Sequence, residues 1–233
     1  MIKNNENTLM QWLKLGLVGA VIVLTGCVSM PSAHDYSAFR NADPHSILVL
    51  PPINNSVEVI APYSLLSQVT GPIAESGYYV FPVTLVEQTF RNNGLTEATD
   101  IHAVPFERVH EIFGADTGLY MTIEKYGTSY VVLSSETVVA ISATLVDLRS
   151  GNVLWQDKAT ASSAESRGNS GGGLVGMLVE AAMNQIIETI TDRGFDIAAI
   201  SSNRLLFAES HNGLLYGPRS PKYGQPVTSE KQK

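Results

Sequence analysis

The sequence predicts an α+β fold in which helices pack on a single mixed β-sheet of about five strands. In the first half of the chain, apolar and β-branched runs typical of strands alternate with helical patterns. The second half has three strand-like segments in a row, followed by one long helical stripe. The expected element order is therefore β-α-β-α-α-β-β-β-α.

The composition is that of a packed protein and argues against nucleic acid as a partner. Of the 233 residues, 44% are hydrophobic and 16% are charged, which suits one sizeable core. The formal net charge is −7, and a surface of that sign repels phosphate backbones. We therefore expect one globular domain, over residues 46–217, and no nucleic-acid partner.

The domain is expected to begin with a strand over residues 47–50. All four residues are apolar and prolines follow them, so this strand should be central and covered on both faces. Turn residues at 53–56 precede a helix over residues 62–76, which Pro72 should kink or divide and Gly77 should end. The inner face of this helix is predicted to comprise Leu65, Leu66, Val69 and Ile73.

A second strand over residues 78–83 is aromatic and β-branched. The next helix, over residues 84–93, is expected to be capped by Thr84 together with Glu87. A short helix follows over residues 105–113. The inner faces of these two helices are predicted to comprise Val86, Phe90, Val109, Ile112 and Phe113.

The strands of the second half follow Gly118. Residues 119–124 alternate, and residues 130–133 either continue that strand or pair back on it. Residues 139–148 and 153–161 form the firmest predicted hairpin, with a turn at 149–152 that Asp147 supports. The inner face of its first strand is predicted to comprise Val139, Ile141, Ala143 and Leu145.

The last part of the domain is predicted to hold a glycine-rich mobile loop over residues 162–173 and a helix over residues 174–193. The apolar residues of that helix recur every four positions, and Gly194 should end it. Residues 205–207 and 214–216 flank Asn212-Gly213, which is a hairpin signal.

A signal-peptide pattern precedes the domain. Lys3 and Lys14 lie before an apolar run over residues 15–24, which is shorter than the ~20 residues that a transmembrane helix needs. The run ends in Leu24-Thr25-Gly26-Cys27, which resembles the lipobox of bacterial lipoproteins. The resemblance implies that a diacylglycerol is attached to the sulfur of Cys27 and that a peptidase cleaves after Gly26, so residues 1–26 are a signal peptide.

Cys27 is the one cysteine of the chain, so neither a disulfide nor a thiolate zinc cluster is expected. Its alternative role is that of a small buried residue at the end of a transmembrane helix. In lipoproteins of bacteria with two membranes, an aspartate after the lipidated cysteine commonly retains the protein in the inner membrane. Val28 stands there instead, so the resemblance implies an outer-membrane anchor, with the domain facing the periplasm.

Residues 27–45 and 218–233 are expected to flank the domain without regular structure. Both segments are polar and punctuated by turn residues. The first is predicted to be a flexible tether behind the lipidated cysteine, although Tyr36 and Phe39 could dock on the domain. The second is predicted to be a disordered tail.

No catalytic, cofactor-binding or metal-binding residue is predicted. His110-Glu111 begins a zinc-protease pattern, but Gly114 stands where the second histidine is needed. The glycine-rich residues 168–173 lack the lysine of a P-loop, and Ser170 lacks the strand that leads into a nucleophile elbow. The five histidines show no ligand spacing; they are His34, His45, His102, His110 and His211.

Several motifs carry a resemblance over nearly all of the chain from Cys27. They are ILVLPP at 47–52, GYYVFPV at 77–83, FGAD at 113–116, LVDLRSG at 145–151 with LW at 154–155, and LLYGPR at 214–219. By these motifs the chain resembles a family of bacterial outer-membrane lipoproteins of unknown function. The element order is similar to the N-terminal domain of TolB, the periplasmic domain of the CsgG secretion lipoprotein and LpoB. These resemblances imply work by protein contact and supply no catalytic residues.

The sequence therefore predicts a non-enzymatic lipoprotein, anchored in a bacterial membrane, that binds other proteins in a secretion or cell-wall assembly. One alternative is a periplasmic enzyme or small-ligand carrier with a cleft between the helices and the sheet. Another is a module that binds peptidoglycan.

Overall fold

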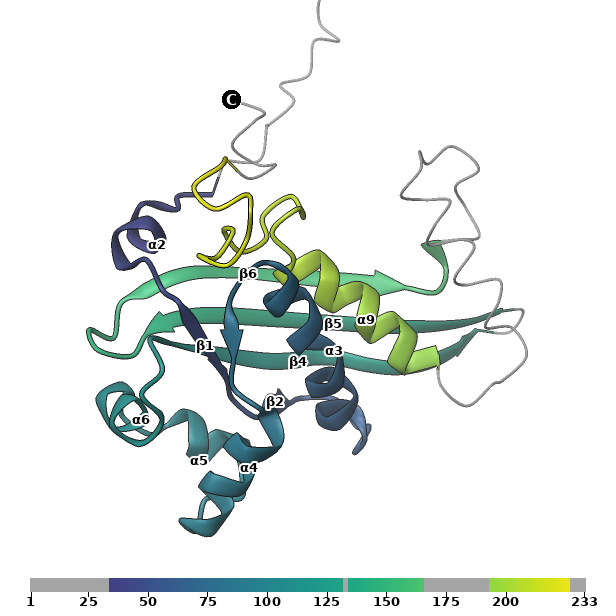
Figure 1. Ribbon diagram of the computed structural model, residues 1–233. Coiled ribbons are helices and arrows are strands. Elements are labelled where there is room, and N and C mark those ends of the chain that lie inside the picture. Colours follow the sequence, from purple (N-terminus) through teal and green to yellow (C-terminus); the bar gives the residue numbers. More distant parts are fainter. Residues whose placement is uncertain (1–33, 132–133, 166–192, 227–233) are drawn as a thin grey trace, which may run out of the picture. The chain divides into compact units, whose positions relative to one another are not determined.

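The computed structural model describes residues 34–131, 134–165 and 193–226 and confirms a mixed α+β fold (Figure 1). Its six-stranded sheet has the order β3-β1-β4-β5-β6, with β2 paired to β4. The strands are β1 Ser46–Val49, β2 Ile53–Asn54, β3 Tyr79–Val80, β4 Thr117–Val131, β5 Ser134–Asp147 and β6 Val153–Ser162. The helices are α2 Ser37–Ala42, α3 Ala61–Glu75, α4 Val83–Asn92, α5 Ala98–His102, α6 Phe106–Phe113 and α9 Arg193–Leu206. None of the described helices is long and apolar enough to cross a membrane.

Strand β1 separates two hydrophobic cores, so the apolar run at residues 47–50 is covered on both faces as predicted. It runs parallel to both β3 and β4. Because successive strand residues point to opposite faces, Ile47 and Val49 enter a large core, whereas Leu48 and Leu50 enter a small one. All four side chains are fully buried.

The large core lies between the sheet and the helices α3 and α9, which pack against each other across the long strands (Figure 1). The predicted inner residues of α3 are buried, and α3 runs through Pro72 without a break. Gly77 follows it with a φ of 103°, which glycine adopts readily. The predicted inner face of β5 is also confirmed, because Val139, Ile141, Ala143 and Leu145 are all buried in this core.

The small core is covered by α4, α5 and α6. Val86, Phe90 and Val109 are buried there as predicted, and Phe113 packs against it. Ile112 is 45% exposed, so its predicted inward position is wrong. Thr84 does not cap α4, which begins one residue earlier behind Pro82, and Glu87 instead forms an ion pair with Arg91.

The strands β4, β5 and β6 form a continuous antiparallel ladder. Strand β4 continues past Gly127 and does not fold back, with a register shift between Ile123 and Lys125. The predicted β5–β6 hairpin is confirmed. Asp147 supports its turn, since its Oδ1 accepts hydrogen bonds from the backbone N–H groups of Arg149 and Ser150.

Both flanks of the domain are more ordered than the sequence predicts. Residues 34–45 include helix α2, and Tyr36 and Phe39 are buried in the large core, so the folded part begins before Ser46. The C-terminal segment 213–226 packs back onto the domain through Tyr223 and the backbone of Arg219. The first segment folds because Tyr36 and Phe39 find apolar surface supplied by distant parts of the chain, and Leu214 and Leu215 do the same for the second.

Several other local predictions are wrong. Residues 53–54 form the short strand β2, where a turn was expected, and α5 was not predicted. Leu205 and Leu206 end helix α9, so the Asn212-Gly213 hairpin does not form. Gly194 lies in α9, so it does not end a helix as predicted. Its lack of a side chain leaves room for the ring of Tyr126, since an added Cβ would lie 2.7 Å from that ring. The predicted loop beyond Glu165 and the helix up to residue 192 lie outside the described residues.

Candidate functional site

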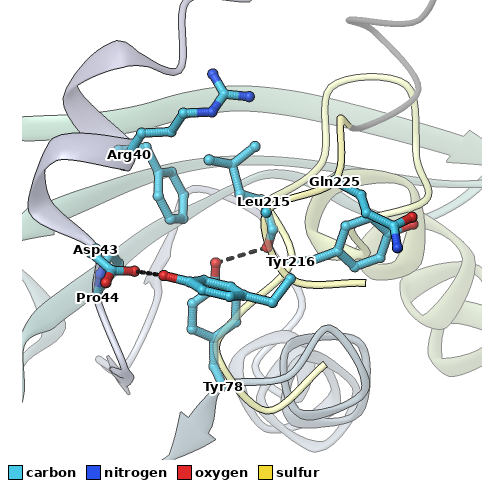
Figure 2. Close-up of a pocket in the computed structure, with 10 residues that line it drawn as sticks. Arg40, Asp43, Pro44, Tyr78, Leu215, Tyr216 and Gln225 are labelled. Carbon is cyan, nitrogen blue, oxygen red and sulfur yellow. Dashed lines mark hydrogen bonds between the residues drawn. The ribbon is translucent and has the colours of Figure 1, made fainter. Parts of the chain in front are cut away.

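A pocket of about 260 Å³ opens between helix α2 and the C-terminal segment 213–226 (Figure 2). We call it the aromatic pocket because rings from four positions line it. Its lining comprises Phe39, Arg40, Asp43, Pro44, Tyr78, Leu215, Tyr216, Tyr223, Gly224 and Gln225. Both segments were expected to lack structure or to form a hairpin, so the sequence did not predict this pocket.

Two hydrogen bonds from tyrosines hold the walls of the aromatic pocket together (Figure 2). The Tyr78 hydroxyl donates to the carbonyl oxygen of Leu215 at 2.7 Å, and burial raises the pKa of Tyr78. The Tyr223 hydroxyl donates to Oδ1 of Asp43, and this bond raises the pKa of Tyr223. The pocket therefore has a carboxylate at its edge and neutral phenols in its walls.

Asp43 is placed by the end of helix α2. It has a φ of 43°, and its N–H bonds to the carbonyl oxygen of Phe39, which is the geometry of a left-handed helix cap. Aspartate tolerates this conformation better than most residues do. The cap turns the Asp43 side chain toward Tyr223, and 51% of that side chain stays exposed.

Two of the resemblance motifs meet beside the aromatic pocket. Gly217, from the motif at 214–219, lies so close to the backbone of Gly77 that an added Cβ would be 2.7 Å away. The N–H of Gly217 donates to the carbonyl oxygen of Ser76 at 2.8 Å, and the N–H of Arg219 donates to that of Gly77. The glycines at 77 and 217 therefore permit the close approach that seats the C-terminal segment.

A second feature is an exposed apolar segment that comprises the loop before helix α3 and the first residues of that helix. Val57 is 92% exposed, Val59 84%, Ile60 61% and Tyr63 52%. We call residues 57–63 the apolar loop. It borders a groove of about 630 Å³, which runs from Pro51 and β2 to α4 and α5. Solvated apolar side chains that gather in this way mark interaction surfaces more often than singly scattered ones do.

The apolar loop is held in place by Asn54. Its side-chain oxygen accepts hydrogen bonds from the N–H and the hydroxyl of Ser56, and its Nδ2 donates to the carbonyl oxygen of Glu58 at 2.9 Å. The Ser56 hydroxyl in turn accepts a bond from the N–H of Glu58. The exposed side chains are thus presented on a fixed backbone.

The histidines His102 and His110 each contact a backbone carbonyl oxygen. His110 Nδ1 lies 2.7 Å from the carbonyl oxygen of Ala115, and Gly114 ends α6 in a left-handed conformation. His102 Nε2 lies 2.9 Å from the carbonyl oxygen of Pro51, and burial lowers the pKa of His102. No group of three or more histidine, cysteine or acidic side chains within residues 34–131, 134–165 and 193–226 could hold a metal ion.

Several predicted site residues lie outside the described residues. They are Leu24, Thr25 and Gly26 of the lipobox, Cys27, and residues 168–173 of the glycine-rich loop. The residues that sequence reasoning missed are Asp43 and Tyr223. The available signal was the presence of aromatic residues, such as Tyr36, Phe39 and Tyr223, in segments otherwise too polar to fold.

Comparisons with known proteins find relatives that are described as putative lipoproteins. A family model described as "Putative lipoprotein GNA1162-like" matches residues 34–219. The "Putative lipoprotein NMB1124/NMB1162" of Neisseria meningitidis serogroup B (strain ATCC BAA-335 / MC58) is 47% identical over 211 residues, which are 90% of this chain and 97% of that protein.

Solved structures are also similar. The crystal structure of lipoprotein GNA1162 from Neisseria meningitidis is 49% identical, with a TM-score of 0.51, and the match covers 63% of this chain and 100% of that one. The LpoB C-terminal domain from Escherichia coli is 15% identical, with a TM-score of 0.36, over 51% of this chain and 83% of that one.

Proposed function

Since the chain belongs to the GNA1162-like lipoprotein family, we propose that it is a lipid-anchored envelope protein that acts by binding another protein through the apolar loop. The observation that carries this proposal is the exposure of Val57, Val59, Ile60 and Tyr63 within seven consecutive residues. Burying these side chains against a partner removes apolar surface from water, which is the main driving force of protein association.

The fixed backbone of the apolar loop supports the same proposal. A loop that is already ordered loses little conformational entropy when it binds, so more of the contact energy appears as affinity. Asn54 supplies this order through its bonds to Ser56 and Glu58. The adjoining groove adds a concave surface in which Leu66, Leu95 and Ile101 take part.

The membrane anchor is the second part of the proposal. The sequence Leu24-Thr25-Gly26-Cys27 and the family's description as lipoproteins both support lipidation of Cys27. Val28 after the cysteine supports the outer membrane, with the domain on its periplasmic side. Anchoring of this kind confines the domain to the membrane surface and raises the concentration of any partner held there.

Metabolic labelling with a fatty acid and cell fractionation test the anchor. The native protein should carry the label and sediment with the outer membrane. The Cys27→Ala variant should carry none and keep residues 1–26. A labelled Cys27→Ala variant, or native protein without label in the soluble fraction, would contradict the anchor.

Site-specific photo-crosslinking in intact cells tests the docking surface. A photoreactive residue at Val57 should yield one defined adduct with an envelope protein. The matched control carries the same residue at Val153, a valine 50% exposed beside the β5–β6 turn. Equal adducts from both positions, or none from Val57, would refute the proposed surface.

A charged double variant sharpens this test. With the photoreactive residue at Tyr63, the changes V57D and I60D should lower the adduct yield by about tenfold, as expected for central apolar contacts. Circular dichroism should show an unchanged fold, since both side chains are solvated. An unchanged yield would place the binding surface elsewhere.

A further inference from the structure

The aromatic pocket combines one carboxylate with several aromatic side chains, a set that suits a cation. Phe39, Tyr78, Tyr216 and Tyr223 contribute rings to the lining, and Asp43 contributes the carboxylate. The face of an aromatic ring attracts a positive charge within about 6 Å, and a carboxylate adds a charge-assisted hydrogen bond. An anionic ligand would instead be repelled at Asp43.

Asp43 has capacity for a further hydrogen bond. Its Oδ1 accepts the Tyr223 hydroxyl, and its Oδ2 lies 3.8 Å from Nε2 of His45. An ionised carboxylate can accept about four hydrogen bonds. Because half of the Asp43 side chain is exposed, a ligand can approach it from solvent.

The same segment already places two of its own cations on aromatic rings. The Lys222 ammonium lies 5.5 Å from the centre of the Tyr216 ring and forms an ion pair with Glu209. The Arg219 guanidinium lies 5.4 Å from the centre of the Tyr79 ring. A ring together with a carboxylate is thus the arrangement that this part of the chain uses for its own ammonium group.

The other polar lining residues and the pocket volume limit the charge, hydrogen bonding and size of the ligand. The Tyr78 hydroxyl is committed to Leu215, so the inner wall offers a ring and no additional donor. The Arg40 side chain extends away from Asp43 (Figure 2), which leaves the negative charge at the Tyr223 edge. A pocket of about 260 Å³ admits a compact group on a thin stem.

From this geometry we propose that the aromatic pocket binds a primary ammonium group carried on an alkyl stem. The ammonium group bonds to Asp43 and lies against the ring of Tyr223, whose hydroxyl bonds to the same carboxylate. The stem packs on Phe39 and Leu215. Such a group occurs on free alkylamines and on lysine-type side chains. The site goes beyond the proposed docking function because it lies on different segments from the apolar loop.

Isothermal titration calorimetry on the full chain, purified in detergent micelles, tests this site with defined probes. N-acetyl-lysine amide represents a lysine side chain, and pentylamine represents a free amine. The neutral isostere is the same lysine compound acetylated at Nζ. We expect the charged probes to bind about tenfold more tightly than the isostere. A difference in affinity of this size corresponds to one or two cation–π contacts.

Variants locate the binding within the protein. Asp43→Asn should weaken binding of the charged probes by about tenfold, and Tyr223→Leu should weaken it several-fold. The matched control is Asp35→Asn, which changes an aspartate outside the lining and should leave binding unchanged. Tighter binding of one charged probe than the other identifies which of the two sources the pocket prefers.

Three results would overturn the proposal. The first is equal affinity for the charged probes and the isostere. The second is no binding of either charged probe at a concentration tenfold above about 1 mM. The third is unchanged binding in a folded Asp43→Asn variant. Loss of probe binding would leave crosslinking at Val57 unaffected, so the two proposals can fail separately.

Discussion

The two faces of the sheet carry cores of different construction. The large core joins residues that are far apart in the sequence, including Tyr36 and Phe39 near the start of the described chain and Leu214 near its end. The small core is mostly local, because residues 81–115 supply the helices that cover Leu48 and Leu50. The large core thus brings together the two ends of the described chain, whereas in the small core strand β1 is covered by helices that are close to it in sequence.

Polar atoms on aromatic side chains make the contrast sharper. In the large core, the Tyr36 hydroxyl donates to the carbonyl oxygen of Gly213 at 2.7 Å, and Nε1 of Trp155 donates to that of Asn212 at 2.9 Å. In the small core, the buried Tyr120 hydroxyl has no hydrogen-bond partner within the described part of the chain. Aromatic residues therefore hold the C-terminal segment by hydrogen bonds on one face, whereas on the other face Tyr120 contributes ring contacts with His102 and Phe106.

The largest expected effect is that of Trp155→Ala in the large core. The side chain is 1% exposed and holds Asn212, so its removal should lower the free energy of unfolding by about 4 kcal/mol. Phe90→Ala in the small core should lower it by about 3 kcal/mol. Urea unfolding measures both. A smaller loss for Trp155→Ala than for Phe90→Ala would contradict the leading role of the large core.

Asp116 lies where strand β1, which separates the two cores, begins. Its Oδ2 accepts hydrogen bonds from the N–H groups of His45 and Ser46 and from the Ser46 hydroxyl, and Oδ1 pairs with Arg149. Burial alone would raise the pKa of Asp116, but these hydrogen bonds and the Arg149 charge together hold it below its usual value.

Asp116→Asn should therefore lower the free energy of unfolding by about 2 kcal/mol at pH 7. A carboxylate with a lowered pKa stabilises the fold above its unfolded-state pKa of about 3.8. That contribution disappears as the pH falls through the lower pKa of the folded state. The gap between native protein and variant should thus close in acid, and a gap that is constant from pH 7 to pH 2 would argue against this role.

The smallest effects come from a matched pair of tyrosines, one in each core. Tyr36→Phe leaves the buried carbonyl oxygen of Gly213 without its donor and should lower the free energy of unfolding by about 1–2 kcal/mol. Tyr120→Phe removes a hydroxyl without a partner and should change it by about zero or raise it slightly. Burial raises the pKa of Tyr120 to about 12, so the Tyr120 hydroxyl of the native protein is uncharged at neutral pH, where the variants are compared. Equal losses of unfolding free energy in the two variants would contradict this difference between the two cores.

Local patterns were enough to predict most of the regular elements. The burial of residues 47–50 and of alternate residues in β5 was predicted correctly. A strand covered on both faces has a continuous apolar run, whereas a strand covered on one face has alternating apolar residues. Asp147 was predicted to support its turn because its partners, Arg149 and Ser150, lie two and three residues away. Thr84 was predicted to be a cap on equally local grounds, but α4 begins behind Pro82.

The candidate sites were the part that local patterns did not predict. The aromatic pocket depends on Asp43 meeting Tyr223, 180 positions later in the chain. No period or spacing within either segment records that contact. The apolar loop was overlooked because apolar residues in a sequence predict burial, whereas Val57 and Val59 are solvated.

The sequence by itself determined the class of fold, the order of the main elements and the residues that resemble a lipobox. Each of these depends on patterns among residues that are close together in the sequence. Only the tertiary structure decided that residues 34–45 and 213–226 fold, and that they enclose a pocket. The physical reason is that these segments hold too few apolar residues to fold alone. They become ordered when Tyr36, Phe39 and Tyr78 bury their rings and the hydroxyls of Tyr36 and Tyr78 donate hydrogen bonds to the backbone of residues 213–226.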